Sequence, residues 1–130
     1  MRRLQNAYKS IYIIEDDPSS ASMLREVLEL EGDASWNITV LSTGSDAMKA
    51  IDAHTPDLVL LDISLPDIDG AAVFKYMRKK FSTRNKPVLF ISGATNYDLH
   101  THGIDEGVLL RKPVSVNSLL HVVRAHLAAA

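Results

Sequence analysis

The chain has 130 residues, of which 46% are hydrophobic and 23% are charged, and its formal net charge is −2. This length and balance predict one globular domain with a single hydrophobic core, and they exclude a disordered chain. No basic stripe stands out along the sequence, so we expect no direct contact with nucleic acid.

The chain also has no cysteine, which excludes disulfides and thiolate zinc sites. No apolar run approaches the roughly 20 residues of a membrane-spanning helix. We therefore expect a soluble, cytoplasmic protein without membrane contact. A polar extension over residues 1–9 should precede a single domain over residues 10–128.

Five short apolar runs, rich in β-branched residues, predict buried strands. They are Ile11–Ile14, Asn37–Leu41, Leu58–Leu61, Val88–Ile91 and Val108–Leu110. Because these runs do not alternate with polar residues, both of their faces should be covered, as in a parallel sheet between two layers of helices. Amphipathic segments separate the runs, and this alternation predicts an α/β doubly wound fold.

Capping residues indicate where the helices begin. Asp17 precedes Pro18 at the start of the first helix, Ser45–Ala53 forms the second, Asp69 caps the third, and Ser115 caps the last. Apolar spacing in the third and last helices predicts the side chains that face the sheet. These are Val73, Phe74, Met77 and Phe81 in the third helix, and Val116, Leu119, Leu120, Val123 and Leu127 in the last.

Three other segments carry weaker signals. Two glycines in Asn96–Gly107 predict only a short or frayed fourth helix. The loop Gly32–Trp36 is slightly long, and we expect a surface excursion with Trp36 folded back. Arg78–Lys80 is most simply a solvated helix end whose charges complement the helix dipole.

Polar residues follow four of the five predicted strands. They are Glu15, Asp16 and Asp17 after the first strand, Asp62 after the third, Ser92 and Gly93 after the fourth, and Arg111, Lys112 and Pro113 after the fifth. Functional groups of open parallel sheets gather beyond the carboxyl ends of the strands. We therefore expect these acids, one hydroxyl and one ammonium to share one rim.

Such a rim suits phosphoryl transfer to a carboxylate. A hard divalent cation relieves the repulsion between neighbouring carboxylates, and Mg²⁺ prefers oxygen ligands. A carboxylate can attack phosphorus and form an aspartyl phosphate. The cation, an ammonium such as Lys112 and a hydroxyl such as Ser92 can then neutralise the oxygens of the transferring group.

Four segments together resemble the signature of response-regulator receiver domains of two-component signalling, a family that includes the chemotaxis regulator. The segments are Glu15-Asp16-Asp17-Pro18, Asp62-Ile63-Ser64-Leu65-Pro66-Asp67-Ile68-Asp69-Gly70, Ser92-Gly93-Ala94 and Lys112-Pro113, and they occur in family order. The resemblance covers nearly the whole chain. It implies a flavodoxin-like five-stranded parallel sheet of order 2-1-3-4-5 with helices on both faces.

The resemblance also assigns a phosphoacceptor and its cation. Asp62 would accept the phosphoryl group from a sensor histidine kinase or a histidine phosphotransfer protein. Asp16 and Asp62 would bind Mg²⁺, or Mn²⁺, and Glu15 would hold a cation-bound water. The backbone carbonyl of Ser64 would be the third protein ligand.

Further residues are implied to act in switching. Lys112 would pair with Asp62 or its phosphoryl group, and Ser92 would bond a phosphoryl oxygen after activation. The peptide bond before Pro113 would be cis. The family commonly carries an aromatic residue where this chain has Leu109, so the route from Asp62 to the surface around Asn96–Gly107 departs from the family pattern.

Two alternatives remain beside this interpretation. Leu109 and the weak fourth helix favour a constitutive interaction module that no longer switches. A phosphohydrolase of the haloacid-dehalogenase type would need an aspartate where this chain has Ser64. The downstream effector or output domain is not evident from the sequence, a homodimer remains open, and any enzymatic activity would be limited to self-phosphorylation and self-dephosphorylation.

Overall fold

The computed structural model describes residues 8–93, 99, 103–104 and 107–128. The strands are β1 (Lys9–Ile14), β2 (Trp36–Leu41), β3 (Leu58–Asp62), β4 (Val88–Ser92) and β5 (Val108–Arg111), and the helices are α2 (Pro18–Glu31), α3 (Gly44–Ala53), α4 (Gly70–Lys79) and α5 (Val116–Ala128). All neighbouring strands run parallel, and their order is β2-β1-β3-β4-β5. The predicted flavodoxin-like fold is confirmed.

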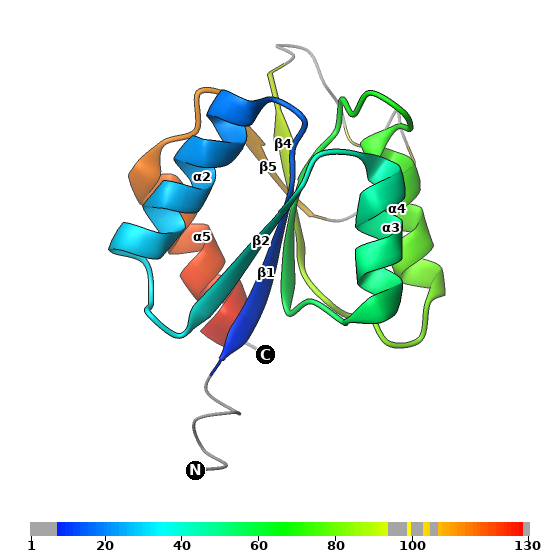
Figure 1. Cartoon of the computed structure of the whole chain (residues 1–130), viewed down its shortest axis with the longest axis horizontal. Helices are drawn as coiled ribbons and strands as arrows, with labels where there is room; N and C mark the ends of the chain where they lie inside the picture. Colours follow the sequence, from blue (N-terminus) through cyan, green and yellow to red (C-terminus); the bar gives the residue numbers. More distant parts are fainter. Residues whose placement is uncertain (1–7, 94–98, 100–102, 105–106, 129–130) are drawn as a thin grey trace.

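Helices cover both faces of the sheet, as the apolar strands require. Helices α2 and α5 lie on one face, and α3 and α4 lie on the other (Figure 1). Side chains that alternate along one strand enter different cores: Ile11 and Ile13 pack toward α2 and α5, whereas Tyr12 and Ile14 pack toward α3 and α4. Strands β3 and β4 are buried along their whole length.

The predicted caps are confirmed. The Asp17 carboxylate accepts from the Ser20 N–H at 2.9 Å, the Asp69 carboxylate from the Ala71 N–H at 2.9 Å, and the Ser115 hydroxyl from the Ser118 N–H at 3.3 Å. Helix α3 begins at Gly44, one residue earlier than predicted, because Thr43 caps it and accepts from the Asp46 N–H.

The inward placement of two apolar residues was wrong. Phe81 is 81% exposed, since α4 ends at Lys79 and the chain turns before Phe81 can reach the sheet. The Thr83 hydroxyl is fully buried and donates to the Met77 carbonyl at 2.7 Å, which fixes this turn. Val116 is 37% exposed because it is the first residue of α5. The other predicted inward residues of the two helices are buried.

The end of α4 is more than a solvated run of charges. The Arg78 guanidinium lies 4.5 Å from the centre of the Phe74 ring and donates to the Lys86 carbonyl at 3.0 Å. The Lys80 ammonium lies 3.2 Å from the Asp52 carboxylate of α3. Lys79 is exposed in the last turn of α4, as predicted for a solvated helix end. Arg78 and Lys80 depart from that prediction, because both are half-buried and the following loop folds back under Arg78.

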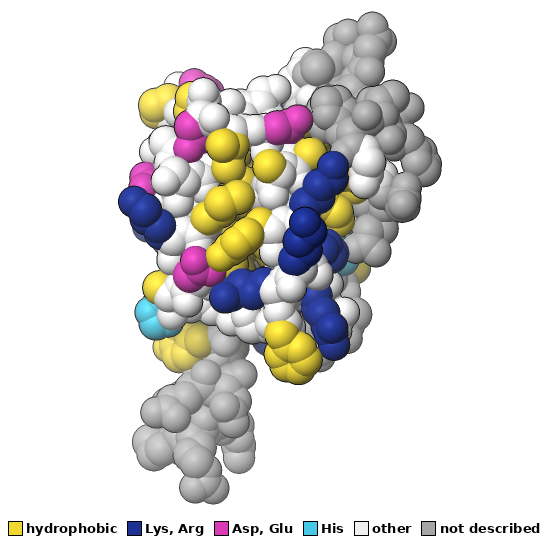
Figure 2. Space-filling model, turned by 90° about the vertical axis from the view of Figure 1, so that its right-hand side faces the viewer, with side chains coloured by type: hydrophobic (Ala, Val, Ile, Leu, Met, Phe, Trp, Pro, Cys, Tyr) yellow, Lys and Arg dark blue, Asp and Glu magenta, His cyan; other side chains and the backbone are white. Residues whose placement is uncertain are grey.

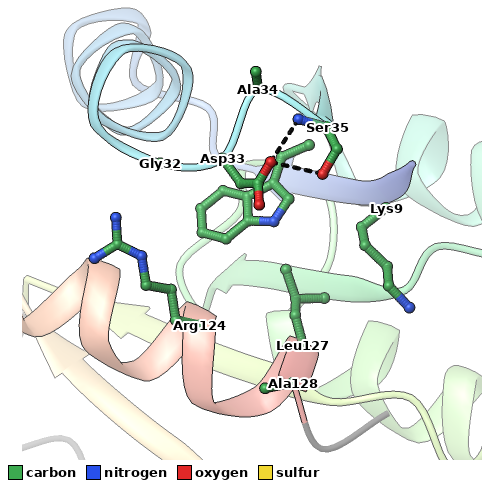
Figure 3. Close-up of a pocket in the computed structure, with 9 residues that line it drawn as sticks. Lys9, Gly32, Asp33, Ala34, Ser35, Arg124, Leu127 and Ala128 are labelled. Atoms are coloured by element: carbon green, nitrogen blue, oxygen red, sulfur yellow. Dashed lines mark hydrogen bonds between the residues drawn. The ribbon is translucent and has the colours of Figure 1, made fainter. Parts of the chain in front are cut away.

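Trp36 folds back as predicted and packs, half-buried, against the core beneath α2 and α5. With Arg124, Leu127 and Lys9 it lines a surface pocket of about 650 Å³ (Figure 3). The Arg124 guanidinium donates to the Glu31 carbonyl at 2.8 Å, which joins α5 to the end of α2. Lys9 and Trp36 begin their strands, so this pocket lies at the opposite sheet edge from the predicted rim.

The predicted fourth helix over Asn96–Gly107 lies mostly outside the described residues. Within its described part, Ile104 is buried and its N–H donates to the Leu99 carbonyl at 3.0 Å. No helix in the described ranges is both long and apolar enough to cross a membrane.

Gly32→Ala tests the packing at the end of α2. A β-carbon at Gly32 would collide with the Leu28 carbonyl oxygen and lie 2.5 Å from the Trp36 ring. We expect the substitution to lower the free energy of unfolding by about 1–3 kcal/mol in urea titrations. Gly93→Ala is the control, since its new β-carbon would meet only the Lys112 side chain at 3.8 Å. Equal effects of both substitutions would contradict this account.

Candidate functional site

Three carboxylates converge where β1 and β3 end. The two strands are adjacent and parallel, with Ile14 opposite Leu61, so Glu15 and Asp62 leave the sheet side by side. Oxygens of Glu15, Asp16 and Asp62 all lie within 4.8 Å of one another. Glu15 and Asp62 are buried, whereas Asp16 is exposed. The cluster therefore opens to solvent on the side of Asp16.

Lys112 supplies the positive charge of the cluster. Its ammonium lies 2.5 Å from Glu15 Oε1 and 3.2 Å from Asp62 Oδ2. The Lys112 N–H donates to the Ser92 carbonyl at 2.9 Å, which continues the β4–β5 pairing beyond β5. The Lys112–Pro113 peptide bond is cis, the geometry that the resemblance implies. Partial burial lowers the pKa of Lys112, but the carboxylates of Glu15 and Asp62 outweigh it and raise the pKa overall.

The pKa of Glu15 is strongly perturbed at the rim. Burial, and then the adjacent Asp62 carboxylate, raise the pKa of Glu15 from its ordinary 4.5 to about 7, although Lys112 and the Asp17 N–H oppose the shift. Its Oε2 accepts from the Asp17 N–H at 3.1 Å. Its Oε1 is buried and accepts no well-oriented hydrogen bond despite the nearby ammonium.

The turn after β3 holds Asp62 in place. The Ser64 N–H donates to Asp62 Oδ1 at 2.9 Å, and the Gly70 N–H donates to the Ile63 carbonyl at 2.8 Å. A β-carbon at Gly70 would lie 2.5 Å from the Asp62 carbonyl oxygen. Glycine thus lets the first turn of α4 approach the backbone that carries Asp62.

The two predicted switch residues sit differently. Ser92 is buried at the end of β4, one residue beyond Ile91, which pairs with Asp62. It therefore shares the rim with the carboxylates. Leu109 is half-buried in β5, opposite Phe90, and packs against the core beneath α3 and α4.

The donor set fits a hard divalent cation. It offers carboxylate oxygens, the ligands that Mg²⁺ and Mn²⁺ prefer. One oxygen from each of the three carboxylates lies within 4.8 Å of the other two, so the donors converge on one position. Buried Glu15 Oε1, which has no well-oriented hydrogen bond within the described residues, adds a second observation that suits an ion or an ion-bound water.

Asp67 contributes to the site in a way that the sequence did not indicate. From its place in the sequence, Asp67 would be only a turn residue. Its two carboxylate oxygens nevertheless accept hydrogen bonds from the Gly44 N–H at 2.8 Å and the Ser45 N–H at 2.9 Å. These hydrogen bonds lower the pKa of Asp67. They fasten the loop after Asp62 to the N-terminus of α3, where the helix dipole also favours a negative charge. A contact 22 residues away in sequence leaves no local pattern.

We expect cation affinity to depend on pH through Glu15. A cation and a proton compete for the cluster, so Mg²⁺ affinity should rise with pH up to about 7, by up to about tenfold per pH unit, and then level off. Titration calorimetry at several pH values measures this. Glu15→Gln should flatten the profile, and an unchanged slope would contradict the assignment.

The stability of the ion-free protein should change in the opposite direction. Because the pKa of folded Glu15 exceeds 4.5, folding takes up a proton between pH 4.5 and about 7. The stabilisation is therefore present below pH 4.5 and is lost as pH rises through 7.

Asp67→Ala tests whether the link to α3 supports the cluster. Loss of the two hydrogen bonds to the N-terminus of α3 should lower the free energy of unfolding. Because the loop carrying Asp62 loses its anchor, Mg²⁺ affinity should also fall, by at least about threefold. Asp46→Ala removes a charge from the same helix end without touching the loop. It should leave Mg²⁺ affinity unchanged, whereas equal affinities for both variants would refute the link.

Comparisons with known proteins agree with the fold. The response regulator receiver domain family matches residues 11–124. The DNA-binding response regulator MtrA of Mycolicibacterium smegmatis is 34% identical over 90% of this chain and 50% of its own length. The polar-differentiation response regulator DivK of Brucella ovis is 28% identical over 94% of this chain and 98% of its own length. The chain thus spans about half the length of some relatives and nearly all of others.

Solved structures give the same result. The response regulator receiver domain of Methylobacillus flagellatus has a TM-score of 0.76 and 26% identity, covering 91% of this chain and 98% of its own. The receiver domain of a DNA-binding response regulator from Colwellia psychrerythraea has a TM-score of 0.79 and 26% identity, covering 90% and 96%. Together with the family match over residues 11–124, these similarities establish that the chain belongs to the response regulator receiver domain family of two-component systems.

Proposed function

We propose that this receiver domain, over residues 10–128, accepts a phosphoryl group on Asp62 from a histidine kinase or a histidine phosphotransfer protein. The observation that carries the proposal is the cluster of three carboxylates with Lys112 in contact with two of them. Asp16 and Asp62 would bind Mg²⁺ or Mn²⁺ together with the Ser64 carbonyl, while Glu15 would hold a cation-bound water.

The chemistry assigns a separate task to each side chain. An Asp62 oxygen attacks phosphorus, a phosphorus–oxygen bond forms, and the bond to the donor's histidine nitrogen breaks. Lys112 neutralises charge on the transferring group, since its ammonium already lies 3.2 Å from Asp62. When bound, the cation supplies the remaining positive charge and orients the reacting oxygens.

Ser92 and Leu109 would couple phosphorylation to the surface. The phosphoryl group adds up to about two negative charges at the rim. The Ser92 hydroxyl donates to one of its oxygens, and half-buried Leu109 repacks in response. Phosphorylation would thereby shift an existing equilibrium between two surface arrangements that effector proteins distinguish.

The direct test is labelling by a small phosphodonor. Acetyl phosphate with Mg²⁺ should add one phosphoryl group by intact-protein mass spectrometry, and chelation of the cation should abolish the addition. Asp62→Asn should stay unmodified, whereas Asp46→Asn should be labelled because it retains Asp62 and the loop that carries it. Absence of labelling in the unaltered protein, with the domain folded and the cation present, would rule the proposal out.

Leu109 supports one second candidate, an interaction module that no longer switches. A leucine cannot present the aromatic ring that the family commonly carries at this position. NMR chemical shifts would separate the two candidates. Phosphorylation that moves only resonances at the rim supports the constitutive module, and changes that extend to β5 and α5 support the switch.

A further inference from the structure

Positive charge is concentrated in one short segment. Residues 75–86 contain six of the chain's 14 lysines and arginines and no acid, although the chain as a whole has a net charge of −2. We call Lys75, Lys79, Lys80, Phe81, Arg84 and Lys86 the basic surface. Figure 2 shows lysine and arginine side chains gathered along one side of the face formed by α3 and α4. The folded chain therefore has a basic surface, which we did not expect from the sequence.

An aromatic ring stands in this surface. Phe81 is the most exposed large hydrophobic side chain among the described residues, at 81%. The Arg84 guanidinium lies 4.8 Å from the centre of its ring. Exposed aromatic and arginine side chains are the residues that most often anchor protein partners.

The loop that carries Phe81 is held by several hydrogen bonds, so the ring is exposed from a fixed backbone. Buried Thr83 donates to the Met77 carbonyl, and Arg78 donates to the Lys86 carbonyl at 3.0 Å. The Arg84 N–H donates to the Lys80 carbonyl at 2.9 Å. A ring presented on such a loop is preorganised, which lowers the entropic cost of binding.

The charges around Phe81 are only partly balanced. Lys80 pairs with Asp52 at 3.2 Å and Lys86 with Asp57 at 3.7 Å. Lys75, Lys79 and Arg84 are exposed, and no acid stands within their own segment. The surface thus keeps a positive excess around an apolar ring, interrupted by two carboxylates.

Phe81 and the loop after α4 form the part of the basic surface that lies far from the phosphoacceptor. Helix α4 begins beside Asp62 and has 10 residues, so its last turn lies about 15 Å along its axis from the rim. The loop that follows α4 leads back to the edge of the sheet where β4 begins (Figure 1). Phosphorylation of Asp62 would therefore add no direct contact at Phe81.

We propose that the basic surface docks an acidic protein segment that carries an apolar residue for Phe81, whether or not Asp62 is phosphorylated. Asp52 and Asp57 would repel a continuous chain of phosphates or an anionic lipid surface, whereas a peptide can place its carboxylates between them. The partners of receiver domains, histidine kinases and effectors, are proteins. These two points favour a protein segment over nucleic acid or a membrane.

Fluorescence anisotropy with a defined probe tests the docking surface. The probe is a fluorescein-labelled peptide of alternating glutamate and leucine, about 12 residues long, whose alternate side chains can meet the ring and the lysines. Phe81→Ser should weaken its binding about tenfold and Lys79→Glu about fivefold. Lys49→Glu reverses an exposed charge on α3 and should change the affinity by less than about twofold. Circular dichroism establishes that each variant is folded.

Three further results would decide against the proposal. They are no binding of the peptide, equal loss of binding in Lys79→Glu and Lys49→Glu, or full binding by Phe81→Ser. Tighter binding of single-stranded DNA or of phosphatidylserine vesicles, with the same sensitivity to Phe81→Ser, would assign the surface to those ligands instead. Binding that requires acetyl phosphate and Mg²⁺ would contradict the proposal that docking is independent of Asp62 phosphorylation. Because labelling of Asp62 is measured in a separate experiment, failure of one proposal can be distinguished from failure of the other.

Discussion

The rim depends on the contact between the Lys112 ammonium and the carboxylates of Glu15 and Asp62. Three carboxylates within 4.8 Å repel one another, and burial of two of them leaves little water to screen the repulsion. One ammonium balances only part of that charge. The raised pKa of Glu15, at about 7, expresses the excess that remains.

The burial of these groups leaves the rim open to solvent on one side. Glu15 and Asp62 are closed off by β1 and β3, and Lys112 covers them from the side of β5. Asp16 alone of the three acids is exposed. A cation or a phosphodonor would therefore approach past Asp16, where desolvation costs least, and would meet the buried pair only after losing part of its water shell.

The sequence predicted this convergence because it follows from local patterns. Continuous apolar runs require a covered parallel sheet, and parallel strands that end in acids must place those acids at one edge. The caps at Asp17, Asp69 and Ser115 were predictable for the same reason, since each bonds to backbone two or three residues away. The roles within the rim came from the resemblance, because four short segments in a fixed order specify more than any one of them.

Most failures of prediction concern contacts between segments distant in sequence or the exact ends of helices. Asp67 reaches α3 across the top of the sheet, and no local pattern distinguishes it from a turn residue. Phe81 continues the apolar spacing of α4, but the helix ends at Lys79, two residues before it, and the Thr83–Met77 hydrogen bond fixes the turn that follows. From the sequence, we expected Arg78 to be solvated, but it donates a hydrogen bond to the Lys86 carbonyl in the loop that folds back after α4.

The two ends of α4 differ in what they contact. At its start, the Asp69 cap and the close approach of Gly70 tie the helix to the backbone of Asp62, so the first turn can hardly move without moving the rim. At its end, the helix stops early and leaves an aromatic ring and several cations outside the core. Burial of Phe81 would have stabilised the fold by about 1.5–3 kcal/mol. The chain forgoes this stabilisation and holds the ring outward on a fixed loop, which is the geometry that the proposed docking of an acidic protein segment requires.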